Sequence, residues 1–235
     1  MIYIKNVKSD YIYLIWKNPQ TRRRYHVGIL KKNEKNYEYR YVDNIDEIIK
    51  IGFHLLVSFP EIKKKYISKE LFPEFLTRIP GPTRVDIKNI LNKYNMIKYD
   101  EFELLKRSGA KTSLDTLEFI DPILNIKDTN IIREFHIAGT RYYCKCQEES
   151  IDIGDLVILK KEIGNQYDIY AVQMYIKEKF VGYIPAYYSE IITKFLNSKN
   201  AENYKCVVVN KTYNCEECLK VKLYLNYNED KMNKE

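Results

Sequence analysis

Short runs of alternating apolar and polar residues, separated by compact turns, constrain what the second half of this chain can fold into. Between residues 135 and 185, three such runs surround a Gly-Thr-Arg-Tyr-Tyr turn, an Asn-Gln-Tyr-Asp loop and a Gly-Tyr-Ile-Pro turn. Alternation with a period of two is typical of strands that bury one face, and the glycine and asparagine positions favour turns. The pattern predicts about five or six short strands in this half, with one clear helix over residues 189–197.

Length and cysteine usage bound the class of protein. A chain of 235 residues can form one large domain or two small ones, and 45% hydrophobic residues suffice for a core. No apolar run approaches the roughly 20 residues that span a bilayer, and the N-terminus has no secretory-signal pattern. Five cysteines are an odd number, which argues against a disulfide framework. A cytoplasmic protein without membrane contact is expected.

The net charge of +7 is carried by one half of the chain. Residues 1–130 hold 24 Lys and Arg against 17 Asp and Glu, whereas residues 131–235 hold 15 of each. The densest basic cluster is Arg22, Arg23 and Arg24, where strand alternation would place the first and third on one face. The cluster is a candidate auxiliary contact to nucleic acid or to an acidic partner. The alternative is a solvated hairpin tip.

The first half reads as a small sheet followed by helices. Apolar, aromatic and β-branched runs predict strands over residues 11–16, 25–30, 37–42 and 116–120, with a buried strand or extended segment over 52–59. Helical periodicity and cap residues predict helices over 45–51, 68–79, 83–95 and 100–107, with Asn44, Ser68 and Thr83 at their starts. Trp16 lies in an apolar strand and is expected in the core.

The turns of the second half, in their order and spacing, resemble the HIRAN domain, a small β-barrel module known mainly as a reader of single-stranded DNA ends. The resemblance covers Phe135 to Pro185. It implies a mainly-β, OB-like barrel with one or two helices over residues 131–227. The polar end of the chain, residues 228–235, is expected to be a flexible tail.

The resemblance also implies which residues hold DNA. Arg141 and Tyr142 would grip a terminal nucleotide, because a guanidinium binds phosphate in a bidentate manner and a tyrosine face stacks on a base. A tyrosine from the last turn, Tyr183, would complete the pocket. Pro185 and Ala186 stand where eukaryotic DNA-binding members often carry lysines, so fewer phosphate contacts are expected.

The loop Asn165-Gln-Tyr167-Asp168 is the second matching piece. The Asp168 carboxylate would accept a hydrogen bond from a free 3′-hydroxyl, and Tyr167 would supply a second stacking wall. A structural alternative stays open, because asparagine and aspartate favour turns whether or not they bind a ligand.

Residues 11–121 resemble a different module, the first N-terminal subdomain of HipA-type serine/threonine kinases. The match rests on motifs in order: Leu14-x-Trp16-x-Asn18, Val27-Gly28-x-Leu30, Tyr37-x-Tyr39-x-Tyr41, Leu71 to Leu76 and Phe102 to Gly109. No Gly-rich phosphate loop, catalytic loop or metal-binding Asp-Phe-Gly motif follows. The loop from Ser108 to Asp115 also departs from the family, which carries a Gly-Arg-Asp run there.

The cysteines leave one metal hypothesis open. Cys144-x-Cys146 and Cys215-x-x-Cys218 would supply four thiolates if a predicted strand carrying the first pair met the loop carrying the second. The alternative, buried strand thiols and a loop pair, needs no metal. The histidines are scattered and form no triad or metal motif. No metal and no cofactor are expected.

These patterns predict an α+β protein with a HipA-subdomain-like domain over 1–125 and a HIRAN domain over 131–227. The resemblances favour a non-enzymatic, antitoxin-like regulatory subunit. It would bind a separate HipA-like serine/threonine kinase and engage single-stranded DNA ends. The alternative is a stand-alone protein that binds DNA ends or damaged DNA in repair or phage defence. A nuclease or other enzyme is disfavoured, because no paired-carboxylate metal motif is present.

Overall fold

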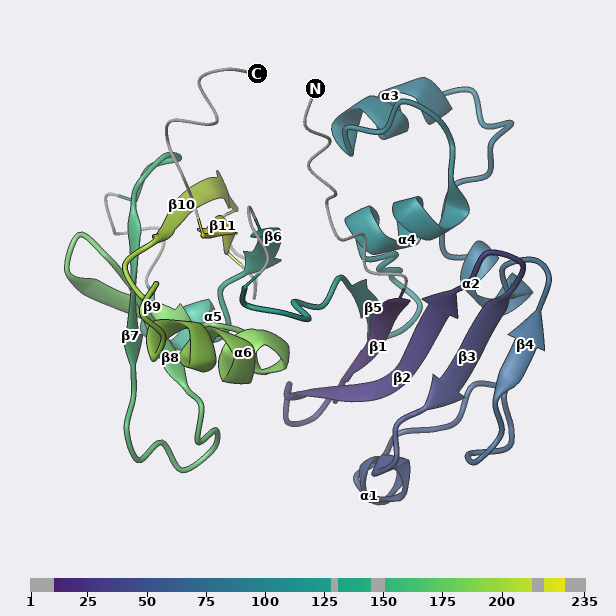
Figure 1. Ribbon diagram of the computed structural model, residues 1–235, viewed down its shortest axis with the longest axis horizontal. Coiled ribbons are helices and arrows are strands. Elements are labelled where there is room, and N and C mark those ends of the chain that lie inside the picture. The colour runs from purple at the N-terminus through teal and green to yellow at the C-terminus, as the bar shows by residue number, and fades with distance from the viewer. Residues whose placement is uncertain (1–10, 128–130, 145–150, 213–217, 227–235) are drawn as a thin grey trace. The chain divides into compact units, whose positions relative to one another are not determined.

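The computed structural model describes residues 11–127, 131–144, 151–212 and 218–226. The chain divides into two compact units, with the boundary between Pro122 and Ile123 (Figure 1). The sequence predicts this boundary near residues 125–131. The predicted tail, residues 228–235, lies outside the described residues. No helix in the described ranges has the length and apolar content that crossing a membrane requires.

The N-terminal unit is built on a five-stranded antiparallel sheet of order β4-β3-β2-β1-β5 (Figure 1). Its strands are β1 (Tyr11–Lys17), β2 (Arg24–Lys32), β3 (Tyr37–Tyr41), β4 (Tyr66–Ser68) and β5 (Leu117–Ile120). Strand β1 alternates because Ile12, Leu14 and Trp16 face the core. The predicted strands of this unit are present, and Trp16 is buried as expected. Residues 52–59, predicted as a buried strand or extended segment, contain turns and no strand.

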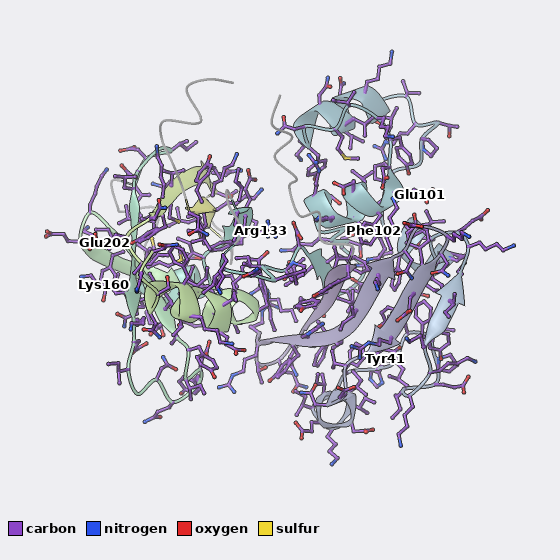
Figure 2. All side chains as sticks on the ribbon, viewed as in Figure 1. Tyr41, Glu101, Phe102, Arg133, Lys160 and Glu202 are labelled. Carbon is purple, nitrogen blue, oxygen red and sulfur yellow. The ribbon has the colours of Figure 1, made fainter. Side chains whose placement is uncertain are left out.

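Tyr39 is the centre of the N-terminal core. Its ring is fully buried, with its centroid 4.4 Å from that of Phe59 and 5.2 Å from that of Phe75. The ring passes over Gly28, where an added Cβ would lie 2.4 Å from the Tyr39 hydroxyl oxygen. Gly28 therefore makes room for the aromatic cluster, and the neighbouring Tyr41 (Figure 2) packs edge-on against Tyr39 at 5.3 Å.

Four helices accompany this sheet: α1 (Ile45–Lys50), α2 (Pro73–Leu76), α3 (Ile87–Lys93) and α4 (Glu101–Ser108). The predicted helix start at Ser68 is wrong, because Ser68 ends β4 and α2 begins at Pro73, which favours the first turn of a helix. The predicted cap at Thr83 is also wrong, since α3 begins only after Asp86. Helix α4 has a true cap: the Asp100 side chain accepts a hydrogen bond from the Glu103 amide.

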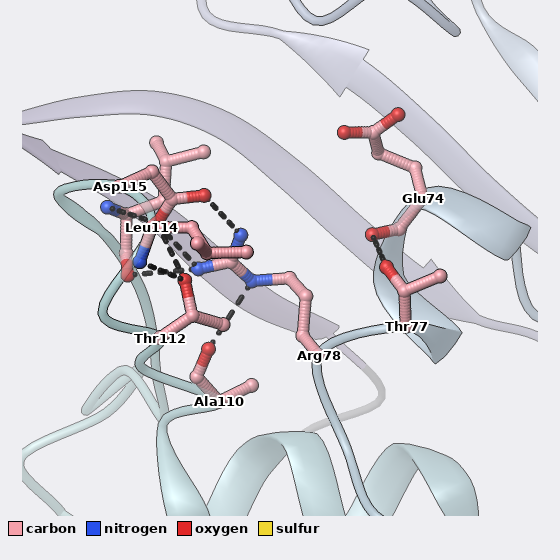
Figure 3. A network of polar contacts seen from close by, with 8 residues as sticks. Glu74, Thr77, Arg78, Ala110, Thr112, Leu114 and Asp115 are labelled. Atoms are coloured by element: carbon pink, nitrogen blue, oxygen red, sulfur yellow. Dashed lines mark hydrogen bonds and ion pairs between the residues drawn. The ribbon is translucent and has the colours of Figure 1, made fainter.

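An arginine clamp holds the loop that follows α4 (Figure 3). The Arg78 guanidinium donates to both carboxylate oxygens of Asp115, at 2.6 and 2.9 Å, and to the carbonyls of Ala110 and Leu117 at 3.1 Å each. The Arg78 side chain is only 7% exposed. Asp115 belongs to the loop in which the sequence departs from the HipA-type pattern, and its contact with Arg78 gives it a structural role there.

The C-terminal unit contains two three-stranded antiparallel sheets. One has the order β10-β11-β6, the other β7-β8-β9. The strands are β6 (Ile131–His136), β7 (Val157–Lys161), β8 (Val172–Ile176), β9 (Lys179–Tyr183), β10 (Tyr204–Lys211) and β11 (Leu219–Leu225), with helices α5 (Thr140–Tyr143) and α6 (Ala186–Leu196). Isolated bridges join Ala138 to Tyr183 and Leu156 to Val207. The described strands thus form two separate sheets and no closed barrel, so the predicted OB-like barrel is not confirmed.

One apolar core lies within the C-terminal unit. Its fully buried members come from both sheets, from α6 and from the segment after β6, among them Ile137, Val172, Val181, Ile192 and Leu219. Helix α6 begins directly after Pro185, three residues before the predicted start at Ser189. Its buried residues Ile192 and Phe195 face this core, so the helix closes one side of the unit.

Candidate nucleic-acid interface

Strands β7, β8 and β9 expose a surface rich in aromatic side chains. In β8 the residues Val172, Met174 and Ile176 are buried, so the alternating residues Gln173 and Tyr175 point to the other side. Tyr175 lies beside Phe180 of β9, with ring centroids 5.6 Å apart, and Phe180 lies 5.1 Å from Tyr183. The rings of Tyr142, Tyr143, Tyr175, Phe180 and Tyr183 make up what we call the aromatic face.

Helix α5 brings Tyr143 onto this face. Gly139 precedes the helix with a positive φ of 80°, which glycine adopts readily, and an added Cβ would lie 3.0 Å from the Tyr143 ring. The Tyr143 ring stands 4.7 Å from Phe180 and 5.6 Å from Tyr183. A single short helical turn thus adds an aromatic side chain to those of the sheet.

Arg141 and Tyr142 lie at the solvent side of the same turn. Tyr142 is 74% exposed, with its ring 6.5 Å from that of Tyr143. The Arg141 guanidinium carbon lies 5.8 Å from the Tyr142 ring centroid, within range of a cation–π contact. The structure therefore places a guanidinium and an exposed ring at the edge of the aromatic face, beside Tyr143.

The second cation of the face comes from β7. The Lys160 ammonium lies 4.6 Å from the Tyr175 ring centroid, and Figure 2 shows this residue at the outside of its unit. Lys160 pairs across the sheet with Gln173, and Gln173 with Tyr183. The face thus has a lysine on one strand and tyrosines on the next two.

A hydrogen bond between side chains of β8 lies on the face. The Tyr175 hydroxyl donates to Gln173 Oε1 at 2.8 Å. Burial and then the Glu162 contact raise the pKa of Tyr183 to about 12, so its phenol stays protonated at neutral pH.

The Asn165 loop is held by its own side chains. Asn165 Oδ1 accepts from the amides of Tyr167 and Asp168, at 2.8 and 3.0 Å, and Asp168 Oδ1 accepts from the Tyr170 amide at 2.8 Å. Asn165 also donates through Nδ2 to Glu162 Oε2 at 2.8 Å. Tyr167 is 79% exposed. Asn165 and Asp168 therefore shape the loop, and Asn165 also connects it to Glu162, the residue after β7.

Gly182 lets β9 approach the segment that leads into α5. Tyr183 exchanges backbone hydrogen bonds of 2.8 Å with Ala138. At Gly182 the φ is +141°, and an added Cβ would lie 2.4 Å from the Ala138 carbonyl oxygen. The glycine is required for this approach, which sets Tyr183 beside Tyr143.

Residues 125–227 match the family model of the HIRAN domain. This segment is a HIRAN domain. Among solved structures, the crystal structure of the HIRAN domain of human HLTF is similar at 17% identity, with a TM-score of 0.33 over 40% of this chain and 73% of that chain. No curated protein matches the chain. The family match does not reach residues 11–121, where the HipA-type pattern lies.

Sequence reasoning missed several side chains in or near the HIRAN domain's aromatic face: Tyr143, Lys160, Glu162, Gln173, Tyr175 and Phe180. The signal was present in the alternation of residues 172–176 and 179–183, which predicts outward positions for Gln173 and Tyr175. The alternation along one strand does not show whether an outward-facing aromatic residue belongs to a site. Its membership of a site depends on which side chains the neighbouring strands and α5 place beside it.

The basic cluster lies in the other unit and is partly engaged there. Arg24 Nε lies 2.8 Å from Glu118 Oε1, and these side chains are only 14% and 8% exposed. Arg22 precedes β2 and has a positive φ of 62°, so strand alternation does not place it on a face with Arg24, contrary to the prediction. Arg23 is exposed. The buried ion pair of Arg24 indicates a structural role.

The described cysteine of the Cys144-x-Cys146 pair does not lie in the strand that the sequence predicts for it. Cys144 ends helix α5 and is buried, so its predicted place in a strand is wrong. Cys206 and Cys218 are also buried, and burial raises the pKa of the Cys206 thiol. Cys146 and Cys215 lie outside the described residues. Within the described ranges, no three His, Cys, Asp or Glu side chains gather as a metal site would require.

Proposed function

We propose that the HIRAN domain of this chain binds the end of single-stranded DNA, with its terminal bases on the aromatic face. The aromatic face itself carries the proposal: exposed Tyr142, half-exposed Tyr143 and the sheet residues Phe180 and Tyr183 lie within 4.7 to 6.5 Å of a neighbouring ring. Each base that stacks on an aromatic side chain contributes about 1–3 kcal/mol. The family resemblance gives the same ligand class.

The distribution of charge favours a short ligand. Residues 131–235 are electrically balanced, and the cations described on the aromatic face are Arg141 and Lys160. Each phosphate contact on a single strand lowers the slope of log K against log salt by about 0.7. We therefore expect a slope of only about −1 to −2. Such a site holds one or two terminal nucleotides by stacking and does not follow a duplex backbone. We propose that the chain acts by binding alone, without catalysis.

Fluorescence anisotropy with a labelled single-stranded oligonucleotide that ends in a free 3′-hydroxyl tests this function. Tyr142→Ala should weaken binding about 5- to 100-fold. Its ring is 74% exposed, so the fold should be unaffected. Arg141→Ala should weaken binding as well. A matched control is Tyr224→Ala, which removes a partly exposed tyrosine from the other sheet of the unit. Unchanged binding by both site variants would exclude the face as the DNA site.

A second proposed role concerns the N-terminal unit, whose motifs resemble the HipA-type subdomain. Large apolar side chains of this unit are almost completely exposed: Val57 at 93%, Val85 at 103%, Ile97 at 104% and Leu114 at 93%. A subdomain that packs on a kinase body is expected to keep such apolar surface. We propose that the unit docks on a separate HipA-like serine/threonine kinase, which would make the chain an antitoxin-like regulatory subunit.

Co-purification with a HipA-like kinase encoded beside this chain tests the second role. A stable complex is expected, and Leu114→Ser with Val85→Ser should weaken it. Free subunits at micromolar concentration would remove the kinase role. They would leave the alternative of a stand-alone protein for DNA ends or damaged DNA in repair or defence.

A further inference from the structure

Two short cysteine motifs of the HIRAN domain have no part in the proposed function. Cys144-x-Cys146 begins where α5 ends, and Cys215-x-x-Cys218 ends where β11 begins. Four thiolates from two such motifs suit a Zn²⁺ ion if the two segments lie together in the fold. Cys146 and Cys215 lie outside the described residues, so the surroundings of Cys144 and Cys218 decide whether the segments meet.

One buried threonine joins the two segments. Thr140, the first residue of α5, is fully buried, and its carbonyl accepts a hydrogen bond from the Cys144 amide at 2.9 Å. Its hydroxyl oxygen lies 3.4 Å from the amide nitrogen of Cys218, which is 78 residues further along the chain. The carbonyl of the next residue, Leu219, accepts from the Ile137 amide at 3.0 Å. The segments that carry the two motifs are therefore neighbours.

Both described cysteines are withdrawn from solvent. Cys144 is 5% exposed and Cys218 is 7% exposed, and both belong to the apolar core of the unit. A buried cysteine often serves as a small apolar residue, so burial alone does not indicate a metal. Apolar packing does not require that two cysteine motifs lie beside the same residue. A zinc site requires such closeness, because each sulfur lies about 2.3 Å from the ion.

We propose that the two motifs bind one structural Zn²⁺ ion, with Cys144 and Cys218 as the ligands that the structure positions. Each thiol loses its proton when it binds the metal. Four thiolates fill the tetrahedral coordination of zinc, which is the arrangement of structural sites. The ion links the end of α5 to the start of β11, so it stabilises the turn that carries Arg141, Tyr142 and Tyr143. The proposal does not rest on the proposed function.

Metal analysis of the full chain tests the proposal. Protein that is supplied with zinc under reducing conditions and then desalted into metal-free buffer should retain about one zinc ion per chain. Cobalt(II) in place of zinc should give the charge-transfer absorption of cobalt–thiolate bonds. Cys144→Ala and Cys218→Ala should each weaken zinc binding at least about 100-fold in competition with a chromophoric chelator, because loss of an outer partner alone costs about 10- to 100-fold.

Cys206→Ala is the matched control. Cys206 is 1% exposed in the same core, but it pairs with Leu223, four residues along β11 from Leu219 and therefore roughly 13 Å away. This variant should keep the zinc ion.

Two results on wild type alone would overturn the proposal, so it does not depend on the folding of a variant. One is a chain that retains no zinc and shows no cobalt–thiolate absorption. The other is an unchanged urea midpoint after a chelator has removed the zinc, which would show an adventitious ion only. Full zinc content in both Cys144→Ala and Cys218→Ala would overturn the proposal as well.

Discussion

At the scale of single residues, Gly182 decides how closely β9 can approach the chain ahead of α5. Its φ of +141° is a conformation that side chains rarely adopt, and the space for a Cβ is filled by the Ala138 carbonyl and by Ile137. The contact determines where Tyr183 stands relative to Tyr143. Stability and the proposed DNA site therefore depend on the same position.

Gly182→Ala should lower the free energy of unfolding by about 3 kcal/mol, because backbone strain and a steric clash add. Urea unfolding measures this, and binding to single-stranded DNA should weaken in parallel. Gly164→Ala is a suitable control: its φ is +80° but nothing lies within 4 Å of the added Cβ. Its cost should be only about 1 kcal/mol. Equal losses for the two variants would contradict the close-approach argument.

Arg24 belongs to the basic cluster but forms a buried ion pair with Glu118, so its role in stability has to be separated from a role in DNA binding. Removing it leaves Glu118, 8% exposed, with Lys111 at 2.8 Å as a remaining cation. Arg24→Ala should therefore destabilise the protein by about 2 kcal/mol, less than the loss of a sole partner would cost. Affinity for single-stranded DNA should not change.

The neighbouring Arg23 supplies the comparison for Arg24. Arg23 is exposed, so Arg23→Ala should change stability by less than about 0.5 kcal/mol. Chemical unfolding and anisotropy on the same samples separate the two effects. If Arg24→Ala weakened DNA binding without loss of stability, the basic cluster would be an auxiliary DNA contact after all.

At the scale of elements, the loop between α4 and β5 is held by one carboxylate. Burial raises the pKa of Asp115, but hydrogen bonds from Arg78 and the Leu117 amide outweigh burial and hold the pKa below its usual value. A carboxyl with a depressed folded pKa stabilises the fold above its unfolded pKa. That stability is lost as pH falls through the folded pKa.

Asp115→Asn should lower the free energy of unfolding by about 1 kcal/mol at pH 7, a value reduced for the partial exposure of the pair. The difference from wild type should shrink below about pH 4, where the unfolded carboxyl becomes protonated. Asp43→Asn, at a fully exposed carboxylate that lies 3.7 Å from Arg40 Nη1, should have little effect at either pH. A loss of equal size at pH 7 and pH 3 would exclude the ionic clamp.

The sequence predicts a helix or strand correctly where the spacing of its own apolar residues determines its structure. The alternation of residues 11–16 and 37–42 predicts strands, and both strands are present. Helix α4 begins after the side-chain cap Asp100 and ends at Gly109, which is left-handed. The predictions are wrong where contacts with neighbouring segments determine the local structure. Ser68 is a good cap residue, but it pairs with Tyr37 of β3 and is therefore part of strand β4. Cys144 follows an aromatic run that favours a strand, yet Gly139 starts a helical turn there.

Some residues of the candidate site could be predicted from short sequence motifs, and others could not. Arg141, Tyr142 and Tyr183 are found at or beside the aromatic face. Glu162 and Phe180 could not be assigned from the sequence, because their role depends on the register of β7, β8 and β9 and on the loop that Asn165 holds.

At the scale of the whole molecule, each unit has a core of its own. Among the residues that the structure describes, the core of the C-terminal unit is drawn from the range 123–225. A fragment of residues 123–235 should therefore fold alone, with one cooperative transition in urea. It should bind single-stranded DNA within about threefold of the full chain, because the residues proposed to hold DNA lie in this fragment and salt screens attraction from more distant charges. A fragment that fails to unfold cooperatively would show that the two units depend on each other.

The central claim is that the aromatic face holds the end of a DNA strand. Photo-crosslinking tests it most directly, with a single strand that carries 5-iododeoxyuridine as its 3′-terminal nucleotide, followed by mass spectrometric mapping on the full chain. We expect the crosslinks at Tyr142, Tyr143, Phe180 or Tyr183, and a loss of yield when the iodinated base is moved to the middle of the strand. Crosslinks confined to residues 11–122, or yields that do not depend on the position of the base, would contradict the claim.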